Sequence, residues 1–232
     1  MPAPVVFVHG LRTSSSMWDP QLRILGDRGW RCVAPDLPGH GDRRGEAFTV
    51  EAALATIDEA IAGWGEPVHL VGCSLGGMFA LHAAALTDRR LLSVVAAGCT
   101  TQPSVRSARA YGRVIGLVDV VGGEGAVRRA MGEDAAAHFL RKGRADLATV
   151  DATVVTVGGF DLLDDVARID APVTFLNGHL DQFRGEERRF LRAARRGRLV
   201  VLPFGTHMVN LTDPGRYTTV LESLLLDAES LS

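Results

Sequence analysis

Short apolar runs alternate with longer segments of helical periodicity along most of the chain. Each run is bounded by glycine, proline or polar residues, a pattern typical of strands that are buried on both faces of a sheet. The runs are Val5–Val8, Arg31–Ala34, Pro67–Val71, Leu91–Ala97, Val173–Leu176 and Leu199–Leu202. Strands that alternate with helices predict an α/β fold, in which a mostly parallel sheet of about six strands carries helices on both faces.

The segments between these runs carry helical signals. Thr49–Trp64 places Val50 and Ile57 on one helical face. Asp19 before Pro20 predicts a helix cap followed by proline at the first helical position. Further helices are expected over Met78–Leu86, Glu186–Arg196 and Pro214–Leu226.

The alternation of strands and helices is interrupted between Gln102 and Phe160. Glycine pairs separate short helical stretches there, and β-branched Thr153–Val157 fits either a strand or a helix. The helical stretches are Arg106–Val118, Ala126–Met131 and Ala135–Arg141. We therefore expect a core of residues 1–101 and 161–232 and an inserted helical cap of residues 102–160 over the carboxyl ends of the strands.

The segment Gly72–Gly76 reads G-x-S-x-G, with Ser74 at its centre. It follows the apolar run Pro67–Val71 and leads into the Ala-rich helical pattern of Met78–Leu86. In a turn this tight the residues two before and two after the serine crowd each other, and glycine relieves the clash. The turn lifts the hydroxyl above the sheet edge, where the amide of Leu75 opens the helix. This spacing predicts a nucleophilic serine, whereas the same pattern without chemistry is a glycine-rich connection between strand and helix.

A serine hydroxyl needs a base to accept its proton, and the base needs an orienting acid. Asp181 follows the run Val173–Leu176, and His207 follows Leu199–Leu202. Both therefore lie just beyond predicted strand ends, in the chain order Ser, Asp, His. His179 also follows a strand, but it is close to Asp181 in sequence, so His207 is preferred as the base. The other histidines are assigned to loops (His9, His40), a strand (His69) and helices (His82, His138).

Acyl transfer also requires donors for the developing oxyanion. The amide of Leu75 is one candidate, and the amide of Leu11, in the loop after the first strand, is the second. Arg12 is either a solvated loop charge or a contact for an anionic substrate group.

Composition narrows the possible partners. The chain has 232 residues and a net charge of −2, which favours neither nucleic acid nor an anionic membrane surface. Cys32, Cys73 and Cys99 are scattered in or beside apolar runs, which indicates reduced core residues without the spacing of metal ligands. We expect neither a leader peptide nor a membrane-spanning run. The expectation is a cytoplasmic monomer or homodimer that acts on a small molecule without metal or cofactor.

These motifs together resemble the α/β-hydrolase fold over nearly the whole chain. The segments that carry the resemblance are Val5–Gly10, Asp36–Gly41, Gly72–Gly77, Asn177–Asp181 and Gly205–His207. The resemblance implies a parallel sheet, a helical cap and a triad of Ser74, Asp181 and His207. The chain begins at the strand that would be third in the full fold, so six strands are implied. The stretch Met17–Gln21 is also similar to a segment of 3-oxoadipate enol-lactonase-like members.

The resemblance leaves several reactions open, because this fold hosts many chemistries. Serine at position 74 differs from the aspartate of the dehalogenase branch. A small carboxylic ester, lactone or thioester cleaved through an acyl-enzyme is favoured; a C–C bond hydrolase, a lyase and a non-catalytic small-molecule receptor are the alternatives. Substrate contacts are expected from Arg12, Trp18, Tyr111 and Phe139, with further apolar walls from Ile115, Val118 and Leu140.

Overall fold

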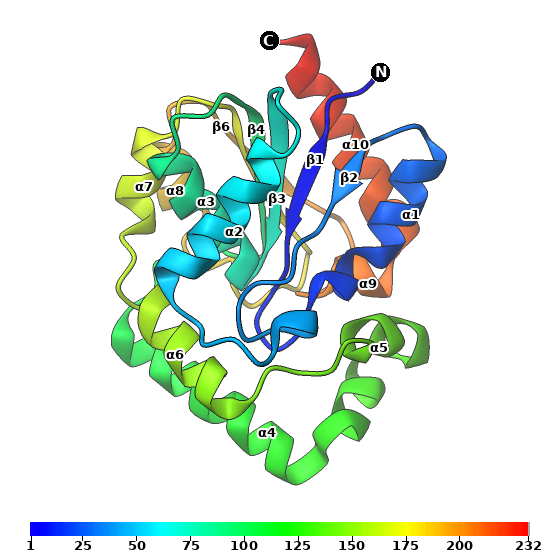
Figure 1. Cartoon of the computed structure of the whole chain (residues 1–232), viewed down its shortest axis with the longest axis vertical. Coiled ribbons are helices and arrows are strands. Elements are labelled where there is room, and N and C mark those ends of the chain that lie inside the picture. The colour runs from blue at the N-terminus through cyan, green and yellow to red at the C-terminus, as the bar shows by residue number, and fades with distance from the viewer. Residues whose placement is uncertain (232) are drawn as a thin grey trace.

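A parallel sheet of six strands runs through the middle of the molecule (Figure 1). The strands lie in the order β2-β1-β3-β4-β5-β6, and every neighbouring pair is parallel. They are β1 (Val5–Val8), β2 (Cys32–Val33), β3 (Val68–Cys73), β4 (Leu91–Ala97), β5 (Val173–Asn177) and β6 (Gly197–Val201). The computed structural model describes residues 1–231, and only the backbone of residues 111 and 115–121. The predicted α/β class with six parallel strands is confirmed.

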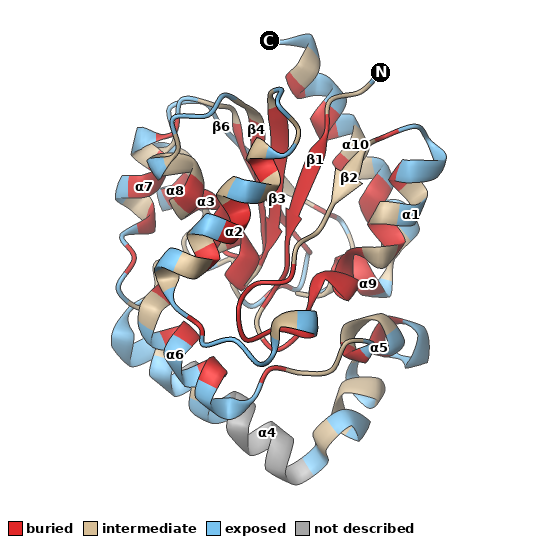
Figure 2. Cartoon of the chain, in the orientation of Figure 1, coloured by how far each residue is buried: buried red, intermediate tan, exposed pale blue. Residues whose placement is uncertain are grey.

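The central strands are buried on both faces, as Figure 2 shows. In β1, Val6 and Val8 pack into one apolar core, and Val5 and Phe7 pack into the other. Successive side chains of a strand point to opposite faces, so a strand that is covered on both sides has to be apolar throughout. At the sheet edge, β2 is shorter than predicted and only half-buried.

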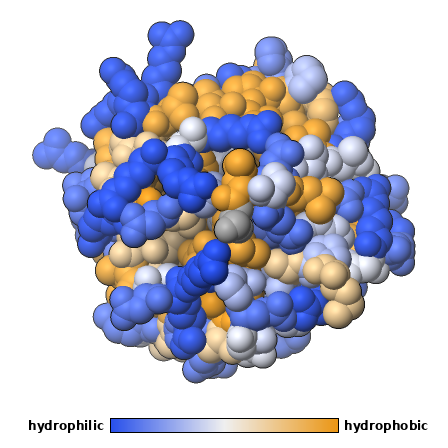
Figure 3. Space-filling model, turned by 90° about the horizontal axis from the view of Figure 1, so that it is seen from above, coloured by the Kyte–Doolittle hydropathy of each residue, from blue (hydrophilic) through white to orange (hydrophobic). Residues whose placement is uncertain are grey.

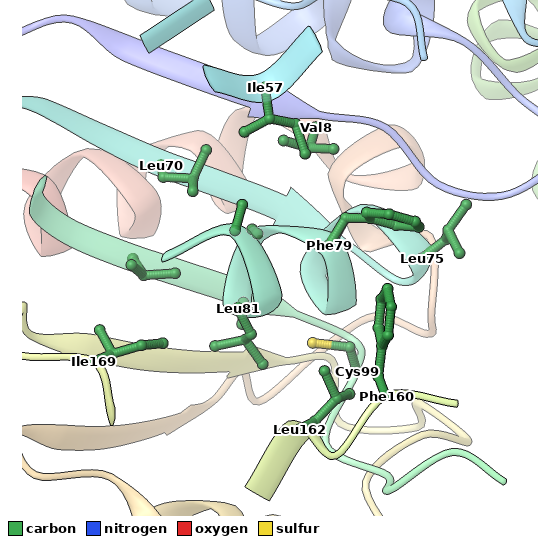
Figure 4. Close-up of a cluster of buried hydrophobic side chains, with 14 of the residues drawn as sticks. Val8, Ile57, Leu70, Leu75, Phe79, Leu81, Cys99, Phe160, Leu162 and Ile169 are labelled. Carbon is green, nitrogen blue, oxygen red and sulfur yellow. The ribbon is translucent and has the colours of Figure 1, made fainter. Parts of the chain in front are cut away.

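Helices cover both faces of this sheet (Figure 1). On one face lie α2 (Val50–Ala62), α3 (Leu75–Leu86), α7 (Leu162–Arg168) and α8 (Glu187–Ala193). On the other lie α1 (Asp19–Asp27), α9 (Val209–Thr212) and α10 (Pro214–Ser230), with the short 3₁₀ helix η1 (Ser15–Trp18). A second 3₁₀ helix, η2, spans Gly41–Arg43. Figure 4 shows Phe79 and Leu81 of α3 packed among side chains of the first core.

Three helices lie beyond the ends to which the strands point: α4 (Val105–Met131), α5 (Glu133–Leu140) and α6 (Leu147–Val157) (Figure 1). Helix α4 is broken at Gly123, whose φ of +50° and ψ of −138° are not helical. Positive φ is readily adopted by glycine, which explains why a glycine pair marks the break. Within the described residues, no helix is both long and apolar enough to cross a membrane.

Several elements differ from the sequence prediction. The ambiguous stretch Thr153–Val157 is the end of helix α6, not a strand. Asp19 is the first residue of α1 and not its cap; its carboxylate instead binds Arg141 at 2.8 Å. Helices α7 and α9 were not predicted, because one or two turns are too short to show helical periodicity.

An ion pair between a half-buried lysine and a buried aspartate ties the segment after α5 to the loop after β2. Lys142 Nζ donates to Asp36 Oδ2 at 2.9 Å, to Asp42 Oδ2 at 2.6 Å and to Ser15 Oγ at 3.0 Å. Burial by itself would raise the pKa of Asp36, but the amides of Asp42 and Ser15 and the lysine outweigh it and lower the pKa to about 2. The carboxylate is therefore held in its charged form.

Asp36 is expected to make the protein sensitive to acid. Because folding lowers its pKa, its contribution to stability is complete above the unfolded value of about 4 and disappears as the pH falls toward 2. Chemical denaturation should show a loss of about 2 kcal/mol over this window. The variant Asp36→Asn should be less stable at neutral pH and should lack this part of the pH dependence.

Asp42→Asn is the matched control for that measurement. It removes a partner of the same lysine, but the Asp42 side chain is 75% exposed, so the loss of stability should stay below about 1 kcal/mol. If both substitutions lowered the stability equally, the larger contribution assigned to the buried Asp36 carboxylate would be contradicted.

Candidate active site

Ser74 occupies a tight turn between strand β3 and helix α3. Its φ is +55° and its ψ is −120°, a strained conformation for a residue with a side chain. A Cβ atom added to Gly72 would lie 2.1 Å from the Gly76 carbonyl oxygen, and one added to Gly76 would lie 2.1 Å from the Val8 carbonyl oxygen. The predicted crowding between the residues two before and two after the serine is confirmed at Gly72, whereas Gly76 is required by the close approach of strand β1.

The loop after strand β1 lies directly against this turn. A Cβ atom on Gly10 would sit 3.7 Å from the Cβ atom of Ser74, and the Gly10 N–H donates to Met17 Sδ at 3.1 Å. Leu11 follows in this loop, and Leu75 opens helix α3. The two residues predicted as oxyanion donors therefore flank Ser74, one from each segment; their role as donors stays a prediction.

Asp181 and His207 meet beyond the carboxyl ends of strands β5 and β6. His207 Nδ1 lies 3.1 Å from each carboxylate oxygen of Asp181. The amide of Phe183 donates to Asp181 Oδ1 at 2.8 Å, and the phenyl ring packs against the imidazole with centroids 4.8 Å apart. A carboxylate bound at Nδ1 fixes the orientation of the imidazole and leaves Nε2 available for proton transfer.

The alternative base, His179, is exposed and is held by its backbone. Its amide donates to the Phe204 carbonyl at 3.1 Å, and Arg184 donates to its carbonyl oxygen. Among the hydrogen bonds of the described residues, the imidazole that binds Asp181 belongs to His207.

His9 and His40 are buried in the loops, where they shape the backbone. The Leu37 amide donates to His9 Nε2 at 2.9 Å, and the His9 Nδ1 atom lies 2.9 Å from the Gly10 carbonyl oxygen. Burial, followed by the nearby charge of His40, lowers the pKa of His9 to about 3. His9 is consequently neutral near pH 7, which agrees with the structural role predicted for it.

Gly98 lies directly behind the Asp181–His207 pair. It follows strand β4 with a φ of +59°. A Cβ atom there would lie 2.8 Å from Asp181 Oδ2 and 2.9 Å from His207 Nδ1. Only glycine leaves room for the two side chains, so the end of strand β4 and the Asp181–His207 pair pack closely together.

Two cavities adjoin at Ser74. The His207 cavity, of about 290 Å³, is lined among others by Ser74, Leu11, Arg12, Phe139, Arg144 and His207. The Met78 cavity, of about 110 Å³, is lined among others by Ser74, Leu11, Leu75, Met78, Val157 and Phe183. Ser74 and Leu11 are common to both, so the hydroxyl stands where the two spaces join.

The residues predicted to contact substrate fall into three groups. Arg12 and Phe139 line the His207 cavity. Trp18 is fully buried between Phe7 and Tyr217, with ring centroids 4.8 and 6.5 Å away; it packs the core and lines neither cavity. The side chain of Tyr111 lies outside the described residues, as do those of Ile115 and Val118.

Other lining residues were not singled out from the sequence. Arg144 follows α5 in a stretch without periodicity or motif, and Met78 reads as an ordinary apolar residue of helix α3. Phe183 follows Asp181 by two residues, and this nearness in sequence is the one feature from which its place at the site could have been predicted. Their common location depends on packing between segments that are far apart in sequence.

A larger cavity of about 510 Å³ lies at the opposite end of the sheet. It is lined by residues such as Arg90, Leu91, Pro172 and Arg196, near the end of the molecule that carries both termini. Figure 3 looks onto that end, where hydrophilic side chains surround apolar patches. The cavity contains neither Ser74 nor His207, so its size alone does not mark it as the active site.

Within the described residues, no cluster of three His, Cys, Asp or Glu side chains is arranged to hold a metal ion.

Comparison with known proteins identifies the family. Residues 5–219 match the alpha/beta hydrolase family. The chain belongs to this family. It is therefore a hydrolase enzyme of the α/β-hydrolase fold, as the resemblance of its motifs implied.

Some relatives align over most of the chain, and all of these are distant in sequence. One relative is RutD of Agrobacterium fabrum, which is named as a carbamate hydrolase. It is 27% identical over 98% of this chain and 95% of its own length. A pimeloyl-[acyl-carrier protein] methyl ester esterase of Pseudoalteromonas atlantica is 26% identical over 87% of this chain and 86% of its own. The solved structure of a thermophilic esterase from Thermogutta terrifontis superposes with a TM-score of 0.79 at 22% identity, covering 97% of this chain and 90% of the other. This last likeness concerns the fold alone.

Proposed function

We propose that the protein is a serine hydrolase that cleaves a small carboxylic ester, lactone or thioester through an acyl-enzyme on Ser74. The observation that carries this proposal is the Asp181–His207 contact of 3.1 Å beside the cavity that Ser74 and His207 share. The strained turn at Ser74 supports it, because backbone strain is retained where function requires it. The name of the methyl ester esterase relative favours an ester as substrate.

In the first half of the reaction, Ser74 Oγ attacks the carbonyl carbon and its proton passes to His207 Nε2. The tetrahedral intermediate then collapses, the bond from the carbonyl carbon to the leaving oxygen or sulfur breaks, and His207 gives its proton to that atom. Water attacks the acyl-enzyme in the second half, with His207 as base. The acid leaves, and the proton returns to Ser74.

Three groups support these steps. Asp181 holds the imidazole in the required orientation and stabilises its protonated form. The amides of Leu11 and Leu75 stabilise the oxyanion, each contributing about 3 kcal/mol to lowering the barrier. Both donors are backbone amides, so this role by itself does not require leucine at either position.

We also propose that residues 102–160 form a cap over the core of residues 1–101 and 161–232. Helices α4, α5 and α6 supply Val127, Phe139 and Val157, respectively, to the walls of the two cavities. On this proposal the cap selects the substrate and takes no part in the chemical steps. Phe139→Ala is then expected to raise KM and change the ranking of esters, while Ser74 still reacts with fluorophosphonates.

A substrate panel tests the proposed function. Purified protein and Ser74→Ala are assayed with p-nitrophenyl esters of increasing acyl length, with lactones and with acyl thioesters. Turnover of one class that is abolished by the substitution supports the proposal. Turnover that survives it, or ligand binding without any turnover, contradicts it.

Gly98→Ala is expected to lower kcat about a hundredfold, because displacing the Asp181–His207 pair by a fraction of an ångström misplaces the base. Steady-state kinetics with an activated ester measures this loss. Gly26→Ala is the matched control, since a Cβ atom at Gly26 meets nothing within 4 Å; it should react like the wild type. If Gly98→Ala retains full activity, the pair is not used in the reaction.

A further inference from the structure

The two cavities at Ser74 differ in which catalytic group they contain. His207 lines the larger cavity, whereas the smaller one has Leu75, Met78 and Val157 in its wall. On the side of the smaller cavity, the ring of Phe183 packs against the imidazole. Each cavity therefore offers a different chemical environment to the two halves of a substrate bound at Ser74.

The proton that His207 releases goes to the leaving atom when the tetrahedral intermediate collapses. The leaving group must for this reason lie on the side of the imidazole, which is the His207 cavity. The acyl group then extends to the other side of Ser74, into the Met78 cavity. With a volume of about 110 Å³ and an apolar wall, this cavity suits a short apolar acyl chain.

The wall of the His207 cavity carries two guanidinium groups. Arg12 is 8% exposed and Arg144 is half-buried. Arg12 also lies close enough to Asp146 for its charge to help lower the pKa of that carboxyl, after the larger effect of the hydrogen bond from the Thr149 amide. Guanidinium groups bind carboxylates and phosphates through parallel hydrogen bonds, and more strongly where water is partly excluded.

The backbone provides a second, independent indication that Arg12 is functional. Among the described residues, only Arg12 and Ser74 adopt a positive φ without being glycine, with values of +64° and +55°. Such strain persists only where surrounding structure imposes it, commonly at catalytic and binding sites. Both strained residues line the His207 cavity.

We propose that the substrate joins a short apolar acyl group, bound in the Met78 cavity, to a negatively charged alcohol or thiol, whose anionic group is bound by Arg12 and Arg144 in the His207 cavity. This assignment rests on the proposed serine hydrolase mechanism, because the proton donor determines which half of the substrate leaves. It makes Arg12 and Arg144 the residues that determine specificity for the leaving group.

Matched esters test the position of the charge. The first pair is 4-butyryloxybenzoate, which has an anionic leaving group, and its neutral methyl ester. The second pair is phenyl hydrogen fumarate, which has an anionic acyl group, and neutral phenyl crotonate, which carries a methyl group in place of the carboxylate on the same trans double bond. A fifth substrate, 4-butyryloxyphenyl phosphate, distinguishes a phosphate from a carboxylate as the preferred anion.

We expect kcat/KM of the wild type to be about tenfold higher for 4-butyryloxybenzoate than for its methyl ester, from one or two charge-assisted hydrogen bonds. Intrinsic reactivity runs the other way, since the carboxylate-bearing phenolate is the poorer leaving group. Arg144→Gln should abolish this preference and Arg144→Glu should reverse it. Arg12→Gln should also abolish it, whereas Arg12→Lys should retain part of it.

Arg90→Gln is the control variant, because Arg90 lies at the opposite end of the sheet; its substrate preference should equal that of the wild type. Fluorophosphonate labelling of Ser74 reports whether each variant keeps an intact active site. Equal rates for both benzoate esters, or a preference for the fumarate over the crotonate that depends on Arg144, would overturn the proposal. Hydrolysis that survives Ser74→Ala would instead contradict the proposed function itself.

Discussion

Ser74→Ala is expected to lower kcat for ester hydrolysis by about a millionfold. Without the hydroxyl no acyl-enzyme forms, and only binding and the oxyanion-stabilising amides remain to accelerate attack by water. The backbone at position 74 has a φ of +55°, which alanine tolerates as poorly as serine, so the turn itself is little changed. Single-turnover and steady-state kinetics with the same activated ester measure the loss.

Covalent labelling gives an independent measure of the same residue. A fluorophosphonate should modify the wild type once per chain and should not modify Ser74→Ala. Ser16→Ala is the control, because Ser16 is fully buried and its hydroxyl already donates to the His138 carbonyl at 2.7 Å. Labelling of Ser74→Ala at the wild-type rate would show that the nucleophile is elsewhere.

His207→Ala should be nearly as inactive as Ser74→Ala, since members of a triad act as a unit. The double variant should lose little more than either single one. Asp181→Asn should cost about ten-thousandfold in kcat, because the amide favours the wrong tautomer of an imidazole that is still in place. Initial rates of the wild type and of these four variants on one substrate measure the losses.

His179→Ala decides between the two histidines that follow strands. The His179 side chain is exposed, and its backbone makes the bonds to Phe204 and Arg184, so its removal should leave the rate close to that of the wild type. An inactive His179→Ala beside an active His207→Ala would mean that the base lies in the other loop.

Local patterns in the chain were sufficient for the sheet and for the turn at Ser74. Apolar runs such as Val5–Val8 are dictated by burial on both faces, and that requirement is visible without a structure. Gly72 is required by a contact of 2.1 Å with the Gly76 carbonyl oxygen, and the spacing that produces this crowding is itself local. Gly76 is instead required by the Val8 carbonyl oxygen of strand β1, a contact that only the assembled sheet creates. The expectation that Asp181 and His207 lie beyond neighbouring strand ends also follows from strand order alone.

The walls of the cavities depended on tertiary structure. Arg12 and Arg144 are far apart in the chain, and they line one cavity because the segment after α5 is tied to the core. Lys142 makes part of that tie through Asp36, yet a single lysine in a polar stretch has no periodicity that predicts a partner. Trp18 was predicted to contact the substrate, but its side chain fills the core instead.

The sequence by itself determined the candidates for the chemistry, Ser74, Asp181 and His207, because tight turns and strand ends are encoded over a few neighbouring residues. Only the tertiary structure decided how the space around Ser74 is divided. That division arises where α4, α5 and α6 meet the core. Contacts between distant segments are set by the complementarity of whole surfaces, and no short stretch of sequence records them.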